Sequence, residues 1–174
     1  MQALRMFFFR LARRFNGTNY VYIVGDTPRT SNSSPETQMN YMNATTKTEA
    51  QIEALLAADD GAPICMVNLL KFRDKAEYED GRETNLSGAE AYQIYGAATG
   101  PLIKKLGGDV VFTSVVKGMV VGEVEELWDV MAIAKYPSLQ AFIDMVSSSE
   151  YLSAYHHRIA GLKGQLNIAS TQVI

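Results

Sequence analysis

A carboxylate among apolar residues is the first candidate for chemistry in this chain. Asp129 alternates with Met131 and Ile133 in a pattern that predicts a strand over residues 127–136. A charged group on an apolar strand face is costly unless it is hydrogen-bonded or near water, and burial favours the protonated form of a carboxyl group. We therefore expect Asp129 to act as a proton donor or base. The alternative is a structural ion pair with one of three basic residues: Lys71, Lys117 or Arg158.

The histidines form a second candidate group. His156 and His157 are followed directly by Arg158 in a segment with helical spacing. Adjacent helical residues point about 100° apart, so these histidines are not expected to chelate one metal ion, and we predict no metal site. His157 is a candidate catalytic base beside Asp129. Arg158 is expected to contact a ligand or to pair with a carboxylate at the pocket mouth or at a dimer surface.

Polar and aromatic residues on predicted strands and helices form a candidate ligand-binding set. Asn68 lies in mid-strand, where its amide would either fix the register of the sheet or orient a ligand carbonyl or hydroxyl. Tyr92 and Tyr95 are three residues apart on one predicted helix and would lie next to each other on its surface. Each aromatic residue has core packing as its alternative role. The full set is Asn68, Tyr92, Tyr95, Trp128, Tyr136 and Arg158.

Capping residues and hydrophobic periodicity predict the elements that position these groups. Helices are expected to begin at Thr48, Ser87 and Ser138 and within residues 147–149, and Gly100-Pro101 is expected to kink or restart the second one. The last helix is expected to turn four residues inward: Leu152, Tyr155, Ile159 and Leu162. Strands are predicted over residues 64–72, 109–122, 127–136 and 166–173.

The order of these elements predicts an α+β fold. It is β-α-β-β-α-β, preceded by one extra helix and with the second helix split in two. This order is typical of the ferredoxin-like arrangement, in which an antiparallel sheet carries both helices on one face.

Composition limits the function further. The chain has 174 residues and a net charge of −3, which is uneven because residues 1–45 contain five arginines against two carboxylates. The acidic remainder argues against nucleic-acid binding. Cys65 is the only cysteine, which excludes an intrachain disulfide and fits a cytoplasmic location. The chain contains no stretch of about 20 apolar residues that would span a membrane.

The first part of the chain differs in composition from the rest. Residues 26–48 are dominated by Thr, Ser, Asn and Pro, which is typical of linkers. We expect residues 1–45 to form a poorly ordered N-terminal extension and residues 46–174 to form the folded domain. Translation from Met39 or Met42 would be another explanation for the change in composition.

Both faces of the predicted sheet are apolar. In strand 64–72, Met66 and Leu70 alternate with Val67 and Leu69, and the next strand has valines on both alternations. Two helices cover only one face, and a bare second face would exceed the roughly few hundred Å² of apolar surface usual on a monomer. We therefore expect a face-to-face homodimer that encloses a barrel-like cavity.

Several motifs of the folded domain occur in the order found in a known family. They are Met66-Val67-Asn68-Leu69-Leu70-Lys71-Phe72, Ala91-Tyr92-Gln93-Ile94-Tyr95, Trp128-Asp129, Tyr136-Pro137-Ser138 with Phe142 and Met145, and Tyr151 followed by His157-Arg158-Ile159-Ala160-Gly161-Leu162. Through them, residues 63–173 resemble the domain of unknown function 1330 family, within the dimeric α/β-barrel superfamily. The resemblance implies the ferredoxin-like fold and the dimer, and it supplies no established activity.

Three functional hypotheses follow. The first is a cytoplasmic homodimer that binds a small, largely apolar or aromatic molecule between sheet and helices, without a cofactor. The second is a cofactor-independent oxygenase or isomerase in the same cavity, with Asp129 or His157 moving a proton. The third is a structural or interaction module whose cavity is filled by side chains. The wider superfamily resembles a collection of oxygenases, isomerases, haem-handling enzymes and ligand binders, so fold alone does not choose among these hypotheses.

Overall fold

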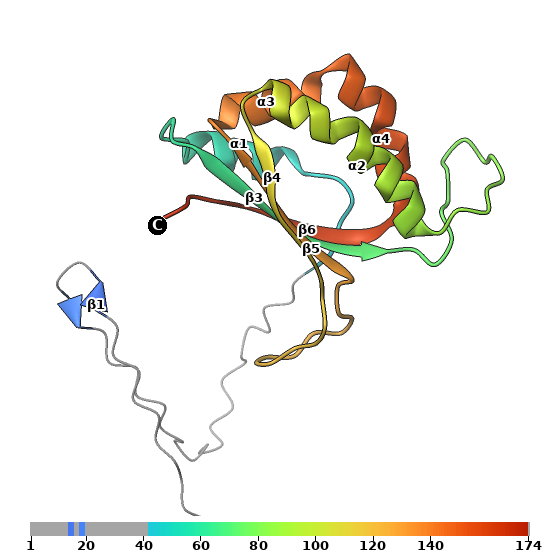
Figure 1. Ribbon diagram of the computed structural model, residues 1–174, viewed down its shortest axis with the longest axis horizontal. Helices are drawn as coiled ribbons and strands as arrows, with labels where there is room; N and C mark the ends of the chain where they lie inside the picture. The colour runs from blue at the N-terminus through green and yellow to red at the C-terminus, as the bar shows by residue number, and fades with distance from the viewer. Residues whose placement is uncertain (1–13, 16–17, 20–41, 174) are drawn as a thin grey trace, which may run out of the picture. The chain divides into compact units, whose positions relative to one another are not determined.

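The computed structural model describes residues 14–15, 18–19 and 42–173 (Figure 1). The chain divides into two units, Met1–Met39 and Asn40–Ile174. In the described part of the first unit, β1 (Arg14–Phe15) pairs with β2 (Thr18–Asn19) as antiparallel strands. The expected disorder of the N-terminal extension concerns residues that lie mostly outside the described ones. The remainder of this section concerns the second unit.

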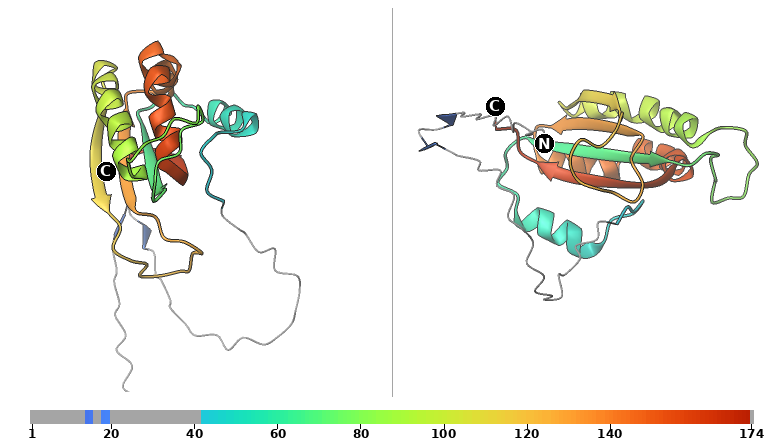
Figure 2. Two further views of the ribbon diagram at one scale, coloured as in Figure 1. Left: turned by 90° about the vertical axis from the view of Figure 1, so that its right-hand side faces the viewer. Right: turned by 90° about the horizontal axis from the view of Figure 1, so that it is seen from below.

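The second unit is built on a four-stranded antiparallel sheet. Its strands are β3 (Ile64–Phe72), β4 (Asp109–Val115), β5 (Val130–Tyr136) and β6 (Leu162–Ser170). Their order across the sheet is β4-β5-β3-β6, so β3 and β5 are the central strands. Helices α2, α3 and α4 all cover one face of this sheet (Figures 1 and 2). The predicted ferredoxin-like α+β fold is therefore confirmed.

The helices begin where their caps predict. Helix α1 (Glu49–Ala57) and helix α2 (Gly88–Lys105) each start with a capping box, formed by Thr48 with Gln51 and by Ser87 with Glu90. Helices α3 (Leu139–Ser147) and α4 (Ser149–Gly161) are capped by the hydroxyls of Ser138 and Ser148. A restart at Gly100-Pro101 does not occur, because α2 continues through Pro101.

The main core lies between the sheet and these helices. Its buried residues come from two strands and from the three helices that face them. Those on the strands are Met66, Ala134 and Tyr136, and those on the helices are Ile103, Leu139, Met145 and Tyr151. Met66 and Leu70 are buried, so the helix-facing side of β3 contains its even-numbered residues. The odd-numbered residues, which include Val67 and Leu69, therefore point to the opposite face.

The predicted inward face of α4 is wrong at one of its four residues, since Tyr155 packs against the core and Leu162 is fully buried. Leu152 was expected to point inward, but it is 59% exposed, whereas its neighbour Tyr151 is buried. Ala154 and Arg158 continue the buried face. The prediction relied on the spacing of large apolar residues. The buried face of α4 also contains the small residues Ala154, Ala160 and Gly161, which such a pattern does not mark.

Four strand boundaries also differ from the prediction. β4 ends at Val115 instead of residue 122, and β5 begins at Val130 instead of residue 127. β6 covers Leu162–Ser170 instead of residues 166–173. The valines after β4 have strand propensity, but the chain leaves the sheet there for a loop of residues 116–129 on the side away from the helices (Figure 1). Trp128 and Asp129 therefore precede β5 and are not part of it.

Two glycines allow α2 and α4 to touch backbone to backbone. A Cβ atom on Gly161 would lie 2.4 Å from the carbonyl oxygen of Gly88, and one on Gly88 would lie 2.4 Å from the carbonyl oxygen of Gly161. Ala91 and Ala160, beside them, are completely buried. This close contact fixes how the side chains of α2 and α4 face each other.

Substitution of the contact glycine tests this packing. Gly161→Ala is expected to lower the free energy of unfolding by about 1–3 kcal/mol, because the new methyl group displaces backbone rather than a flexible side chain. The matched control is Gly96→Ala within α2, where a Cβ meets nothing within 4 Å. That change should raise stability by about 0.5–1 kcal/mol. Urea unfolding of both variants measures this, and equal effects would contradict the proposed contact.

Candidate functional site

Tyrosines from two helices gather on the helix-facing side of the sheet. The ring centroids of Tyr92 and Tyr95, both on α2, are 5.2 Å apart. Tyr151 of α4 meets Tyr95 edge-on at 5.9 Å, and Tyr155 lies 5.7 Å from Tyr151. Tyr136 reaches the same core from β5. We call Tyr92, Tyr95, Tyr136, Tyr151 and Tyr155 the tyrosine cluster.

Burial favours the protonated form of four hydroxyls of this cluster. It raises the pKa of Tyr92 to about 12 and raises the pKa values of Tyr95, Tyr136 and Tyr151 above their usual range as well. The Arg158 guanidinium opposes part of this rise in pKa at Tyr92, Tyr95 and Tyr151. These three hydroxyls therefore lie within the electrostatic influence of one cation and remain hydrogen-bond donors at neutral pH.

That cation is almost completely buried. Arg158 is 8% exposed, and its Nη1 donates to the carbonyl oxygen of Thr45 at 2.7 Å and to the Tyr155 hydroxyl at 3.4 Å. Among residues 42–173 no carboxylate forms an ion pair with it. Within the described part of the chain, the acceptors of Arg158 are thus a hydroxyl and a backbone carbonyl, and that carbonyl belongs to a segment that the sequence assigned to the N-terminal extension.

Two side-chain amides lie on strands beneath the helices. Asn68 alternates with Met66 and Leu70, and its Nδ2 donates to the carbonyl oxygen of Met66 at 3.0 Å. Gln165 of β6 lies opposite Leu70 and is 8% exposed. Its side-chain oxygen Oε1 is buried without a hydrogen-bond partner in the described structure. The sheet therefore presents an unused acceptor on this side.

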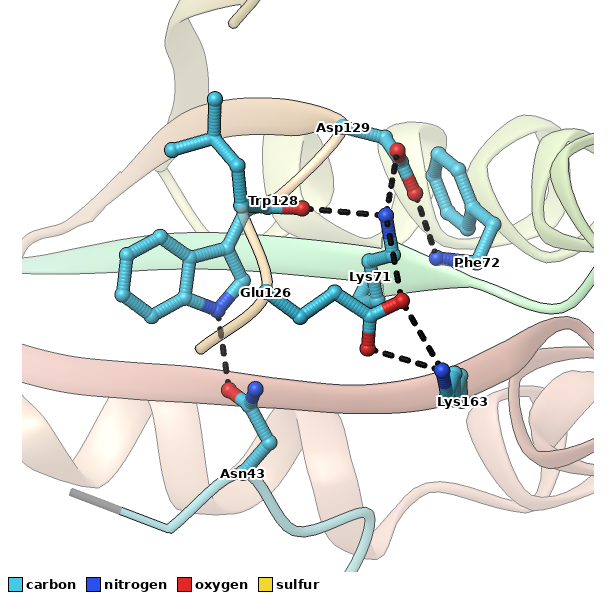
Figure 3. A network of polar contacts seen from close by, with 8 residues as sticks. Asn43, Lys71, Phe72, Glu126, Trp128, Asp129 and Lys163 are labelled. Carbon is cyan, nitrogen blue, oxygen red and sulfur yellow. Dashed lines mark hydrogen bonds and ion pairs between the residues drawn. The ribbon is translucent and has the colours of Figure 1, made fainter. Parts of the chain in front are cut away.

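Asp129 belongs to a different network, at the end of β3 (Figure 3). Its Oδ1 accepts from the Lys71 ammonium at 3.0 Å, and its Oδ2 accepts from the backbone N–H of Phe72 at 2.8 Å. Lys71 also donates to the carbonyl oxygen of Leu127. The Asp129 side chain is 41% exposed, so this carboxylate closes the end of the strand and is not enclosed in a cavity.

Glu126 and Lys163 extend this network from β3 to the neighbouring strand β6. Glu126 lies 2.8 Å from Lys163 and 3.7 Å from Lys71, and these cations hold its pKa below the usual range. The hydrogen bond to Asp129 raises the pKa of Lys71. Trp128 donates through its indole Nε1 to the side-chain oxygen of Asn43 at 2.9 Å (Figure 3). These contacts attach the loop before β5 to β3 and to the segment around residue 43.

His157 lies in a third cluster. Its Nδ1 and the hydroxyl of Tyr78 are 2.7 Å apart, and the His156 ring lies beside it. Arg82 stacks on the Tyr78 ring at 3.9 Å from the centroid. Partial burial, followed by the charges of His156 and Arg82, lowers the pKa of His157. Because Asp129 contacts Lys71 while His157 contacts Tyr78, the structure does not join the two predicted catalytic residues.

The structure brings together five of the predicted residues on the helix-facing side of the sheet: Asn68, Tyr92, Tyr95, Tyr136 and Arg158. Trp128 lies elsewhere, with Asp129. Sequence reasoning did not assign Tyr151, Tyr155 or Gln165 to the site. The spacing of Tyr151, Tyr155 and Arg158, by four and then three residues, places them on one helical face and was a usable signal.

A separate small cavity lies between α1 and the rest of this unit. Its volume is about 160 Å³, and it contains none of the predicted site residues. Its lining includes Leu55, Asp59, Ile64 and Ala169. In the described part of the chain, no group of three metal-ligating side chains gathers in one place, and no helix is long and apolar enough to cross a membrane.

Comparison with known proteins places the chain in a family. The model of the family called Domain of unknown function (DUF1330) matches residues 82–171. The chain belongs to this family. The family resemblance expected from the sequence motifs is therefore confirmed. None of the functionally curated proteins is significantly similar to the chain.

Solved structures agree with this assignment. A crystal structure of methylated RPA0582 protein is 37% identical over 76% of this chain and 96% of that chain, with a TM-score of 0.70. The structure of RPA0582, a protein of unknown function from Rhodopseudomonas palustris, is 34% identical over 76% and 99% of the two chains, with a TM-score of 0.69. A weaker likeness is to SnoaB, a cofactor-independent oxygenase from Streptomyces nogalater, at 16% identity over 66% and 94% of the chains and a TM-score of 0.41.

Stability measurements distinguish the structural role of Asp129 from a chemical one. Asp129→Ala is expected to lower the free energy of unfolding by about 1–2 kcal/mol, because the Phe72 N–H and Lys71 both lose an acceptor. Asp129→Asn should cost less than about 1 kcal/mol, because an amide oxygen still accepts from Phe72 and the ion pair is partly exposed. Urea unfolding gives both values.

The control for this prediction is Asp144→Ala on the surface of α3, where the carboxylate accepts only from Gln140 within its own helix. It should change stability by no more than about 0.5 kcal/mol. If Asp129→Ala were as stable as the original protein, the strand-closing role would be wrong, and a chemical role for this carboxylate would regain support.

Proposed function

We propose that this protein binds a small, largely apolar or aromatic molecule between the helices and the sheet, at the tyrosine cluster. The observation that carries the proposal is the gathering of buried tyrosine hydroxyls on the helix-facing side of the sheet, the side on which the unused amide acceptor of Gln165 also lies. Pockets for small molecules are typically apolar surfaces with a few polar groups that fix the ligand's orientation. We further propose a cytoplasmic location, supported by the burial of Cys65, the only cysteine.

The polar content of the layer favours a ligand over a core filled by side chains. Buried polar groups in folded proteins are nearly always hydrogen-bonded, and one left without a partner lowers stability. The Oε1 atom of Gln165 has no partner in the described structure. A ligand hydroxyl or amide group that donates to this oxygen would remove the deficit. The interaction-module hypothesis offers no donor for it.

The enzymatic alternative, a cofactor-independent oxygenase or isomerase, has less support. It needs a group that takes or gives a proton beside the bound molecule. Asp129 and His157, the two candidates, lie in separate clusters and have partners there. Binding without turnover is therefore the function that we propose.

Removal of one hydroxyl tests the proposed site. Ligand-observed NMR with two neutral aromatic probes, phenol and benzamide, should detect binding to the original protein at millimolar concentration. Tyr95→Phe keeps the ring and removes the hydroxyl, and it should weaken binding about three- to tenfold. The matched control is Tyr78→Phe, which removes a buried hydroxyl from the His157 cluster and should leave affinity unchanged. Failure of both probes to bind, or equal effects of the two variants, would contradict the proposal.

We also propose that the protein is a homodimer formed through the open face of the sheet. On that face, Val67 lies between Ile133 and Ile168, and Leu69 lies between Met131 and Leu166. Ile168 is 49% exposed, and Phe112 from the edge strand adds a further exposed ring. A contiguous apolar surface of this kind usually marks an interface. A second copy of the sheet is its natural complement.

An arginine on the open face tests the dimer. Light scattering should give about twice the 19.2 kDa mass of one chain for the original protein. Ile168→Arg should give the monomer mass, because it places an unpaired charge in the interface. Leu152→Arg is the control, since Leu152 is also an exposed aliphatic residue but lies on α4 in the helix layer. A monomeric original protein, or dissociation by both variants, would contradict this interface.

A further inference from the structure

We infer that the tyrosine cluster is an anion site, in which Arg158 binds the carboxylate of a small aromatic or apolar acid. This inference rests on the proposed function, because it specifies the ligand of the same site. It is carried by a largely buried arginine whose guanidinium charge has no acidic partner among residues 42–173.

The partners of Arg158 do not balance its charge. Both of its hydrogen bonds use Nη1, and both acceptors, the Thr45 carbonyl and the Tyr155 hydroxyl, are neutral. A guanidinium has five N–H donors in a planar fork that matches a carboxylate in two-point geometry. Nε and Nη2 therefore remain available for such a contact. Buried charges in proteins are normally paired, so an unpaired one suggests that its partner is a ligand.

The groups around Arg158 add donors and no competing negative charge. Tyr92, Tyr95 and Tyr151 lie within the influence of the guanidinium, and burial keeps their hydroxyls neutral. The Tyr95 and Tyr151 hydroxyls are hydrogen-bonded to each other, and Tyr92 adds a further neutral hydroxyl beside the cation. A neutral hydroxyl beside a cation is a suitable donor for an anionic oxygen. The rings of Tyr92, Tyr95 and Tyr151, tilted or edge-on to one another, supply an aromatic surface for the body of the ligand.

The unused acceptor of Gln165 belongs to the same neighbourhood. Ala44 pairs with Gln165 through two backbone hydrogen bonds, and the next residue, Thr45, holds Arg158. One short segment thus connects a buried cation without an anion to a buried oxygen without a donor. A ligand that has both a carboxylate and a hydroxyl group would satisfy both. Among simple acids, a hydroxybenzoate has this combination.

A purely structural role for Arg158 is the competing explanation, since its contact with Thr45 attaches residues 43–45 to α4. The two roles differ in what a neutral replacement does. If the guanidinium serves only as a clamp, Arg158→Met should affect the fold and have no selective effect on acids. If it binds a ligand anion, Arg158→Met should remove the preference for acids and preserve binding of neutral molecules.

The test compares benzoate with benzamide, which has nearly the same shape and no charge. Titration calorimetry on the full chain should show that benzoate binds at least about tenfold more tightly than benzamide. Arg158→Met should reduce that ratio to about one, and Arg158→Lys, which keeps a charge, should preserve part of it. The matched control is Arg82→Met, which removes a cation from the Tyr78 cluster and should leave the ratio unchanged.

Each outcome decides a different point. If benzamide binds as tightly as benzoate to the original protein, the anion site is wrong while the proposed function stands. If neither compound binds, both proposals fail. If inorganic phosphate displaces benzoate equally well, the site recognises charge alone and the aromatic acid is wrong. If Arg158→Met does not fold, the ratio in the original protein and in Arg158→Lys still decides the question.

Discussion

The backbone contact between α2 and α4 at Gly88 and Gly161 determines where the candidate site lies. No side chain intervenes there, so the two helices approach each other more closely than helices that meet through larger residues. From this contact, α2 presents Tyr92 and Tyr95, and α4 presents Tyr151 and Arg158 on its buried face. The nearness of these side chains is therefore a consequence of two residues that have no side chains. The loop of residues 73–87 is tied to the same place, because Arg73 donates to the Gly161 carbonyl.

The alternation of β3 separates two tasks on one strand. Met66 and Leu70 face the helices and the tyrosine cluster, while Val67 and Leu69 face away from them. Lys71 continues the second series, so its network with Asp129 and Glu126 borders the open apolar face. A one-residue shift in register would exchange the two sets and bury Lys71 under the helices. The hydrogen bond from the Phe72 N–H to Asp129 opposes such a shift, which gives this carboxylate a structural purpose without any catalysis.

Most of the fold could be predicted from the sequence, because caps and alternation are local signals. Thr48, Ser87 and Ser138 marked their helices correctly. The errors occurred where distant contacts override local propensity. β4 ends at Val115 although valines follow it, with Val116 making one backbone hydrogen bond to Asp129 before the chain enters the loop. In α4, small residues are buried while Leu152 points outward.

The candidate site was less predictable than the fold, because its most important contact joins residues 113 positions apart. Arg158 was expected to contact a ligand or a carboxylate, because charge complementarity is the main basis for predicting the partner of an arginine from sequence. A backbone carbonyl can come from any residue and leaves no trace in the sequence. Gln165 was missed for the same reason, since nothing local distinguishes a buried glutamine from an exposed one.

The contact with Thr45 also explains why an unpaired cation persists in the folded protein. A guanidinium is weakly hydrated, and a carbonyl oxygen at 2.7 Å offsets part of its desolvation without cancelling its charge. A carboxylate of the chain in that position would occupy the donors that a ligand anion needs. The neutral carbonyl therefore leaves these donors available for the ligand anion that we propose. On this basis the empty protein should be less stable than its complex, and the difference should depend on the charge of the ligand more than on its size.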